Sequence, residues 1–253
     1  MQNNAKKISK MINTKDQEEL LRLIADYIDS DVTCAAIGGT AMMFLGYKST
    51  TKDIDLVFGT DGDRNVFIKA IEKLGYSKKS LKFIYNEHQI KDKNKPLLYS
   101  RGEERFDLFV KGVFGFEIDL SKIVQRHDFI GKKEITLLVL TKELLILLKS
   151  VTNREKDYED IETIVKIEQN IDWNLIIGLA IQQRKNNSWI LIDLEEKMKK
   201  LKTVTFIKQE CFDKIYNAQR HSSKYTESKL TQNDVDEISE KIDSSVAKKL
   251  GLK

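Results

Sequence analysis

Proline and cysteine are scarce in this sequence, which limits the kinds of protein that it can encode. Its 253 residues include one proline, Pro96, and two cysteines, Cys34 and Cys211. Because the cysteines are far apart and neither belongs to a Cys-x-x-Cys pair, we expect neither a disulfide framework nor a zinc site. Because no stretch is rich in proline, glycine or serine, we expect domains that are joined by packed helices rather than by a flexible linker.

Long apolar runs are also absent. The longest apolar stretch, residues 135–148, is interrupted by Thr141-Lys142-Glu143 and does not reach the roughly 18 residues of a membrane helix. The first fifteen residues are polar and lack the apolar region of a signal peptide. We therefore expect a cytoplasmic protein with no membrane partner.

Two common nucleotide-binding fingerprints and a strong charge of one sign are missing as well. There is no Gly-x-Gly-x-x-Gly and no Gly-Lys-Ser/Thr, which argues against a dehydrogenase and against a P-loop enzyme. The 43 basic and 39 acidic residues give a net charge of +4. This near balance permits a nucleic-acid partner without requiring one, because binding to phosphate backbones depends on clustered charge.

The apolar pattern changes character at Thr141. Before it, short apolar or alternating runs predict strands at 32–37, 54–58 and 104–110, with helices between them and short strand character at 81–85. After it, the spacing is mostly helical. We predict the fold class α+β, with a small mixed β-sheet flanked by helices in residues 1–140 and a helical domain in residues 141–253.

The sequence contains ten acidic-x-acidic pairs, and the surroundings of Asp53/Asp55 distinguish that pair. On a strand, residues two apart share a face, whereas on a helix they do not. Only Asp53/Asp55 and Glu117/Asp119 lie in strand-like apolar surroundings, and only Asp53/Asp55 follows a glycine turn at short range.

Two carboxylates on one strand face suit the chemistry of nucleotidyl transfer. Two divalent ions about 3.5–4 Å apart can stabilise the attacking and leaving oxygens at phosphorus, and Mg²⁺ prefers carboxylate, phosphate and water oxygens. Asp107, between Phe106 and Leu108, is our candidate for a third carboxylate on a neighbouring strand. Glu117 or Asp119 is the alternative, and a solvated strand end or a salt bridge to lysine is the plain structural interpretation of the first pair.

The glycine pair Gly38-Gly39 precedes a short apolar helix. Glycine lacks Cβ, so the backbone there can approach a phosphate closely, and Thr40 adds a hydroxyl. A Gly-Gly pair by itself usually marks only a tight turn.

A charged connection follows the apolar run that ends at Leu148. It contains Lys149, Arg154 and Lys156, which could offset the charge of a triphosphate. Ion pairs at a junction between two helices explain the same residues equally well, and their spacing does not separate the two interpretations.

These segments together resemble a known family. In chain order they are Gly38-Gly39-Thr40-Ala41, Thr51-Lys52-Asp53-Ile54-Asp55-Leu56, Arg105-Phe106-Asp107-Leu108-Phe109, and Lys149 through Arg154 to Asp157 and Asp160. Over roughly residues 30–165 the set resembles the DNA polymerase β-type nucleotidyltransferase superfamily. More narrowly, it resembles the small prokaryotic branch related to the AbiEii-like toxins of toxin–antitoxin systems.

The resemblance implies a donor NTP (ATP, CTP or another) and a two-metal Mg²⁺ site. It implies metal binding by Asp53, Asp55 and Asp107, with Asp107 as the general base towards an acceptor hydroxyl. The residues that it implies for nucleotide binding are Gly38, Gly39, Thr40, Lys149, Arg154 and Asp157.

The resemblance leaves the acceptor and the partners open. A tRNA end, a protein side chain and a small molecule are all candidate acceptors, and an antitoxin protein is a candidate partner. The main alternative function is a catalytically inactive nucleotide-binding or regulatory module, for example an antitoxin.

Overall fold

The computed structural model describes residues 12–83, 85, 90–113, 115–152 and 154–223. The chain forms two compact units, residues 1–207 and residues 208–253, and each is considered by itself. Every candidate site residue lies in the first unit. Of the second unit, helix α9 (Gln209–Ser223) is described.

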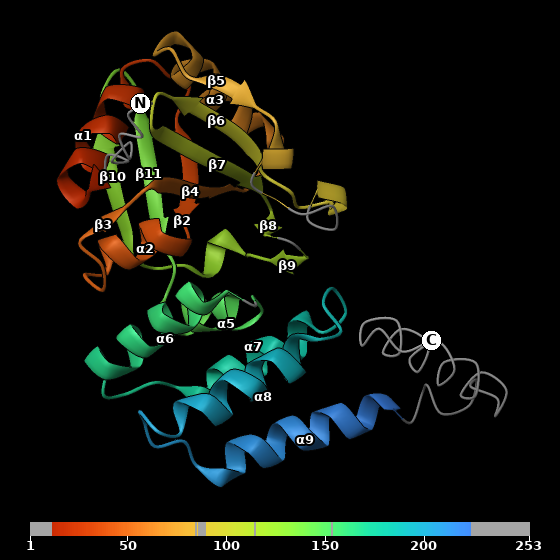
Figure 1. The fold of residues 1–253 in the computed structure, drawn as a ribbon. Helices are drawn as coiled ribbons and strands as arrows, with labels where there is room; N and C mark the ends of the chain where they lie inside the picture. Colours follow the sequence, from red (N-terminus) through yellow and green to blue (C-terminus); the bar gives the residue numbers. More distant parts are fainter. Residues whose placement is uncertain (1–11, 84, 86–89, 114, 153, 224–253) are drawn as a thin grey trace, which may run out of the picture. The chain divides into compact units, whose positions relative to one another are not determined.

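A seven-stranded mixed sheet forms the centre of the first unit (Figure 1). Its strands, in spatial order, are β10 (Arg126–Ile130), β11 (Glu134–Val139), β2 (Val32–Ala36), β4 (Asp53–Phe58), β7 (Glu104–Val110), β6 (Leu97–Arg101) and β5 (Ser77–Lys79). The β11–β2 and β4–β7 pairs are parallel, and the other neighbours are antiparallel. The strands that carry the candidate carboxylates, β4 and β7, are therefore direct neighbours in the sheet.

Smaller elements surround this sheet. They are the two-stranded sheets β1 (Ile12–Asn13) with β3 (Thr50–Thr51) and β8 (Gly112–Val113) with β9 (Phe116–Glu117), and the 3₁₀ turns η1 (Leu81–Phe83) and η2 (Leu120–Lys122). The strand character predicted at 81–85 is wrong where this segment is described, because η1 occupies it. The Ser80 hydroxyl accepts a hydrogen bond from the Lys82 N–H, a local bond of the kind that competes with strand pairing.

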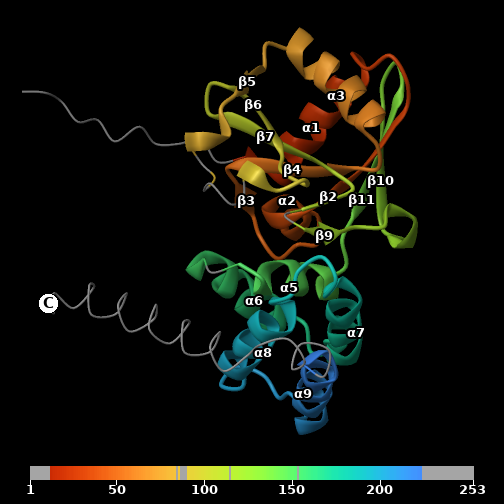
Figure 2. The same ribbon diagram turned by 90° about the vertical axis from the view of Figure 1, so that its right-hand side faces the viewer.

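Three helices in the described ranges flank the sheet. On one face lie α1 (Thr14–Ala25), which begins at a capping box made by Asn13 and Asp16, and α3 (Asp61–Lys73). On the other face lies α2 (Gly38–Phe44), which packs against β4 and against helix α5 (Lys142–Ser150) (Figure 2). The short α2 thus lies between the sheet and α5.

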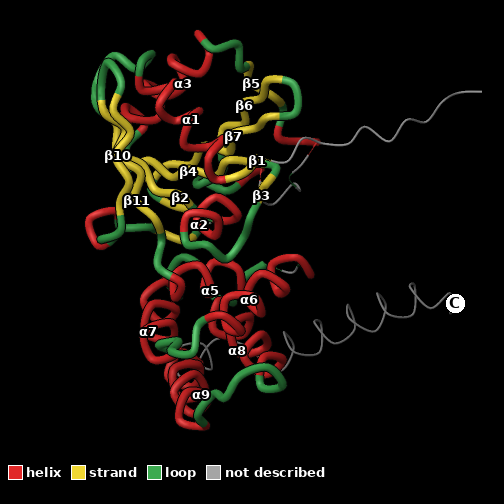
Figure 3. The backbone as a smooth tube through the Cα atoms, turned by 90° about the vertical axis from the view of Figure 1, so that its left-hand side faces the viewer, coloured by secondary structure: helices red, strands yellow, loops and turns green. Residues whose placement is uncertain are grey.

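Four helices follow β11 within the first unit. They are α5 (Lys142–Ser150), α6 (Glu155–Ile167), α7 (Trp173–Gln183) and α8 (Ile190–Leu201) (Figure 3). The change from strands to helices falls at Thr141, whose hydroxyl caps α5 by accepting from the Leu144 N–H. The predicted fold class, a mixed sheet flanked by helices and followed by a helical region, is confirmed. The division into two domains at residue 140 stays a prediction.

Strand alternation separates the core side chains from the carboxylates. Phe58 of β4 and Phe106 of β7 both contact the ring of Phe67 on α3, with ring centroids 5.4 Å and 5.5 Å away. Asp53 and Asp55 have the opposite parity on β4, so they face the side of the sheet where α2 lies.

None of the helices in the described part of the chain combines the length and the apolar character that crossing a membrane requires.

Candidate functional site

Three carboxylates and one guanidinium form a block on two neighbouring strands. In the parallel β4–β7 register, Asp53 lies opposite Arg105, and Asp55 lies opposite Asp107. Side chains two apart on a strand share a face, and adjacent strands are about 4.8 Å apart. All four side chains therefore gather on the same face of the sheet. The structure thus brings together the three carboxylates that the sequence analysis selected.

Arg105 is a member of this block to which the sequence analysis gave no role. Its Nη2 lies 2.5 Å from Asp53 Oδ2, and its Nε lies 3.1 Å from Asp107 Oδ1. The guanidinium therefore joins the first and the third carboxylate diagonally across the two strands. In the sequence, Arg105 is one of 43 basic residues, and only the strand register shows which carboxylates it meets.

Tyr85 is a second residue that the sequence analysis missed. Its hydroxyl donates a hydrogen bond to Asp107 Oδ2. Asp107 itself is only 1% exposed, so Tyr85 satisfies one oxygen of a carboxylate that water scarcely reaches. Tyr85 follows η1 and is 22 residues from Asp107 in the chain, so no sequence periodicity links the two.

Gly38 allows Asp55 to come close to the start of α2. A Cβ at Gly38 would lie 2.7 Å from Asp55 Oδ2, and Gly38 has a φ of +54°. At Gly39 a Cβ would lie 2.7 Å from the Thr51 hydroxyl oxygen. The glycine pair is thus needed to pack α2 against β3 and β4, whether or not a phosphate binds there.

Substituting Gly38 by alanine should destabilise the protein more than the same change at Gly46. Both glycines have positive φ, but a Cβ at Gly46 would meet nothing within 4 Å. The backbone penalty of about 1–2 kcal/mol is therefore common to both variants, and the crowding of Asp55 adds about 1–3 kcal/mol for Gly38→Ala. Urea unfolding of the two variants measures the difference. Equal losses would show that Asp55 moves aside without cost.

Thr40 connects α2 to β4. Its hydroxyl accepts a hydrogen bond from the Asp55 N–H at 3.0 Å and lies 3.5 Å from the Asp53 carbonyl oxygen, to which it donates. The side chain is fully buried. Thr40 therefore fixes the backbone that carries both carboxylates, and its contact with a donor phosphate stays a prediction.

The crowded carboxylates have perturbed acidities. The pKa of Asp55 is raised from 3.8 to about 7, first by burial and then by the negative charges of Asp107 and Asp53. Burial also raises the pKa of Asp53 and of Asp107, although Arg105 opposes both shifts. The three carboxylates of the block thus carry more negative charge than the single guanidinium offsets. Strongly perturbed pKa values of this kind are typical of functional sites.

Replacing Asp55 by asparagine should remove a pH dependence of stability. A carboxyl whose pKa is about 7 in the folded protein and about 3.8 in the unfolded chain keeps its proton up to a higher pH in the folded state. Its contribution to stability is then complete at low pH and is lost as the pH rises to about 7. In the presence of a chelator, Asp55→Asn should therefore gain melting temperature relative to the wild type between pH 5 and pH 8. An equal difference at both pH values would contradict the assigned shift.

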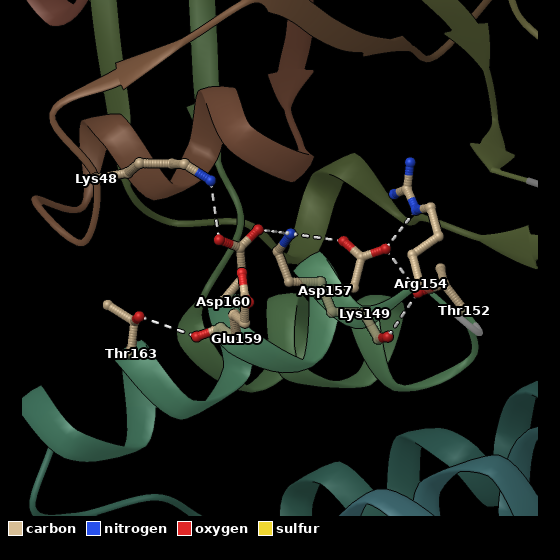
Figure 4. A network of polar contacts seen from close by, with 8 residues as sticks. All are labelled: Lys48, Lys149, Thr152, Arg154, Asp157, Glu159, Asp160 and Thr163. Atoms are coloured by element: carbon tan, nitrogen blue, oxygen red, sulfur yellow. Dashed lines mark hydrogen bonds and ion pairs between the residues drawn. The ribbon is translucent and has the colours of Figure 1, made fainter. Parts of the chain in front are cut away.

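A second polar network lies where α5 meets α6 (Figure 4). Lys149, only 5% exposed, places its Nζ 3.1 Å from Asp157 Oδ1 and 2.7 Å from Asp160 Oδ2. Lys48, in the loop after α2, also binds Asp160, at 2.9 Å. This network attaches the helices to the α2 side of the sheet.

Arg154 completes the network at its exposed end. Arg154 Nε and the Thr152 hydroxyl both donate to Asp157 Oδ2 at 2.6 Å. Burial alone would raise the pKa of Asp157, but Lys149, Thr152 and Arg154 together hold it below its usual value. The Arg154 side chain remains 74% exposed. Of the two interpretations that the sequence left open, the ion-paired helix junction is therefore present.

The charges of the α5–α6 network affect the pKa values of the carboxylate block. The charge of Lys149 lowers the pKa of Asp55, and that of Lys156 lowers the pKa of Asp53, each as a minor cause beside burial. The pKa of Arg154 is raised chiefly by Asp157, against the opposing effect of burial, and in part by Asp55 and Tyr85. The cations of the α5–α6 connection thus lie close enough to the block to act on the acidities of its carboxylates.

The alternative third carboxylates lie elsewhere. Glu117 belongs to the separate β8–β9 sheet, and Asp119 caps η2 through Ser121 and pairs with Lys122. Neither is part of the seven-stranded sheet that carries Asp53 and Asp55. Of the candidates, Asp107 alone lies directly opposite Asp55.

The donor set of the block fits a hard divalent cation, although no group of three ligand-type side chains in the described ranges is already arranged as a metal cage. Asp107 Oδ1 is a buried oxygen with no hydrogen-bond donor among the described residues, because Arg105 Nε is near it but poorly aligned. Carboxylate oxygens are the ligands that Mg²⁺ prefers. A divalent cation at Asp53, Asp55 and Asp107 would supply the positive charge that Asp55 lacks, and Arg105 would have to yield its place.

Comparisons with known proteins give structural likenesses only. No family model matches the sequence, and no curated protein matches it. One similar structure is ANT(2″)-Ia in complex with adenylyl-2″-tobramycin, with a TM-score of 0.41, 17% identity, and coverage of 67% of this chain and 97% of that chain. Another is a protein from H. pylori that is described only provisionally as a nucleotidyltransferase, with a TM-score of 0.36, 14% identity, and coverage of 85% and 97%. At such low TM-scores and identities, these two similarities say nothing about the function of this protein.

Proposed function

We propose that this protein is a Mg²⁺-dependent nucleotidyltransferase that moves a nucleoside monophosphate from an NTP to an acceptor hydroxyl. The observation that carries the proposal is the block of Asp53, Asp55 and Asp107 on one face of β4 and β7, beside the cations of the α5–α6 connection. Three carboxylates in one place are costly unless positive charge joins them. Divalent metal ions, bound together with the triphosphate, would supply that charge.

The described residues divide into an acidic and a basic part, and each has a role in this proposal. Asp53, Asp55 and Asp107 would hold the metal, which stabilises the negative charge at phosphorus when it is bound. The exposed Arg154 would offset the charge of the donor phosphates, and Lys149 would add to the positive field from its buried position. Lys149 and Asp157 also hold Arg154 in place.

Asp107 is the proposed general base. It would accept the proton of the acceptor hydroxyl as that oxygen attacks the α-phosphorus and pyrophosphate leaves. The hydrogen bond from Tyr85 supports this role, because it shows that a hydroxyl can reach Asp107 Oδ2 from the α2 side of the sheet. On the donor side, Gly38, Gly39 and Thr40 at the start of α2 are the proposed phosphate contacts, and Gly38 and Thr40 lie directly beside Asp55.

The identity of the acceptor is a further part of the proposal. A tRNA end, a protein side chain or a small molecule would each present a suitable hydroxyl. Membership of the AbiEii-like branch and a role in a toxin–antitoxin system with an antitoxin partner are proposed from the resemblance in sequence alone. A cytoplasmic location is proposed from the lack of long apolar runs.

Label transfer tests the proposal directly. The protein is incubated with each α-³²P-labelled NTP, Mg²⁺ and either total RNA or a cell lysate, and the products are separated by size and by nuclease or protease sensitivity. We expect one NTP to label one class of acceptor. Absence of labelled product with every NTP and every acceptor fraction would contradict nucleotidyl transfer.

The alternative is a catalytically inactive module that binds a nucleotide or regulates a partner. The ion pairs of Arg105 favour it, because a guanidinium already compensates Asp53 and Asp107. The two functions differ in their metal requirement. An inactive module would bind NTP with the same affinity in Mg²⁺ and in EDTA and would give no labelled acceptor.

A further inference from the structure

The place that a metal would take in the carboxylate block is partly filled by Arg105. Of the four side chains in the block, three are acids and one is this guanidinium. Arg105 contacts Asp53 of the neighbouring strand β4 at 2.5 Å and Asp107 of its own strand β7 at 3.1 Å, and its side chain is 24% exposed. Asp53 and Asp107 come from different strands, so the guanidinium also links the strand ends electrostatically.

We propose that Arg105 is a built-in counter-cation that competes with the divalent metal for Asp53 and Asp107. The inference rests on the proposed function, since it assigns a regulation to the same site. A guanidinium is a delocalised cation that can bind two carboxylates at once, so Arg105 attracts both Asp53 and Asp107. A divalent metal must therefore displace the guanidinium from Asp53 and Asp107. The metal affinity of the protein then depends on how much more strongly the carboxylates bind the metal than they bind Arg105.

The geometry indicates that the exchange is feasible. Arg105 Nη2 is well paired with Asp53, but Arg105 Nε is not aligned with Asp107 Oδ1 as a hydrogen bond. The contact with Asp107 is therefore the weaker of the two. Asp55 lies directly opposite Asp107 and takes no part in an ion pair among the described residues, so the guanidinium pairs with only two of the three carboxylates. A divalent cation carries twice the charge of arginine and interacts with all three carboxylates.

Metal binding without nucleotide tests the inference. Mg²⁺ affinity is measured by titration calorimetry, and Mn²⁺ affinity by the loss of the free-ion EPR signal, for the wild type and for Arg105→Gln. We expect Arg105→Gln to bind either metal about tenfold more tightly or better, since one competing charge is gone. Its melting temperature in EDTA should fall by several degrees, and Mg²⁺ should restore it.

Arg126→Gln is the matched control. Arg126 and Asp128 are also an Arg-x-Asp pair on one strand, with a 2.7 Å contact, but they lie on the edge strand β10. This variant should leave both metal affinities unchanged. Should Arg105→Gln fail to fold, Arg105→Lys serves instead, because a single ammonium cannot bridge two carboxylates as a guanidinium does. Its affinity should lie between those of the wild type and the glutamine variant.

Three results would overturn the inference. They are an unchanged metal affinity in Arg105→Gln, a weaker one, and the absence of metal binding by both proteins. The titrations contain neither nucleotide nor acceptor, so they are independent of the transfer reaction. A protein that binds metal as expected but labels no acceptor would count against the proposed function alone.

Discussion

Replacing both Asp53 and Asp55 by alanine should reduce nucleotidyl transfer by about 10³-fold or more while the protein stays folded. The two carboxylates would hold the metal that neutralises the transferring phosphate, and a metal ion contributes several kcal/mol to such a transition state. Both side chains lie at the partly exposed end of β4, outside the Phe58–Phe67–Phe106 core, and their own repulsion is relieved. The melting temperature in EDTA should therefore be unchanged or higher.

The control for this variant is a second acidic-x-acidic pair in the same chain. Asp29 and Asp31 have the same spacing and charge, are exposed, and lie between α1 and β2. The Asp29→Ala/Asp31→Ala protein should keep its transfer rate, measured with the same labelled NTP and acceptor. Retention of full activity by the Asp53/Asp55 variant would remove these residues from the site.

Replacing Lys149 by methionine should destabilise the protein by about 3 kcal/mol or more. The change leaves Asp157 and Asp160 without their shared partner, and removing one member of a buried ion pair typically costs about 3–5 kcal/mol. Lys48 and Arg154 remain as partial compensation, which favours the lower end of that range. Urea unfolding at pH 7 measures the loss.

Lys166→Met is the control for this loss. Lys166 pairs with Glu162 on the surface of α6, and exposed pairs contribute between zero and about 1 kcal/mol. The pH dependence provides a second check. The pKa values of Asp157 and Asp160 lie below their usual range, so the stability that they give is present above about pH 4 and is lost in acid. The difference between wild type and Lys149→Met should therefore shrink as the pH falls below 4. A constant difference would mean that lost packing, rather than lost charge, causes the effect.

Sequence pattern was enough to select Asp53 and Asp55, and to make Asp107 the preferred third candidate, because their signal is local. Each lies in an apolar strand, and strand alternation places Asp53 and Asp55 on one face. The same local logic gave the change from strands to helices at Thr141. It was wrong at residues 81–85, where the composition resembles that of a strand but residues 81–83 form a 3₁₀ turn, in which the Ser80 hydroxyl accepts a hydrogen bond from the Lys82 N–H.

The remaining features of the site depend on contacts between residues that are far apart in the chain. The sequence by itself determined the residue types of the site, the fold class and the absence of two nucleotide-binding fingerprints, because composition and periodicity are properties of short segments. Only the tertiary structure decided that Asp107 rather than Glu117 lies beside Asp55, since strand register is set by packing of the whole sheet. The same register places Arg105 among the carboxylates, and the fold brings the Tyr85 hydroxyl to Asp107.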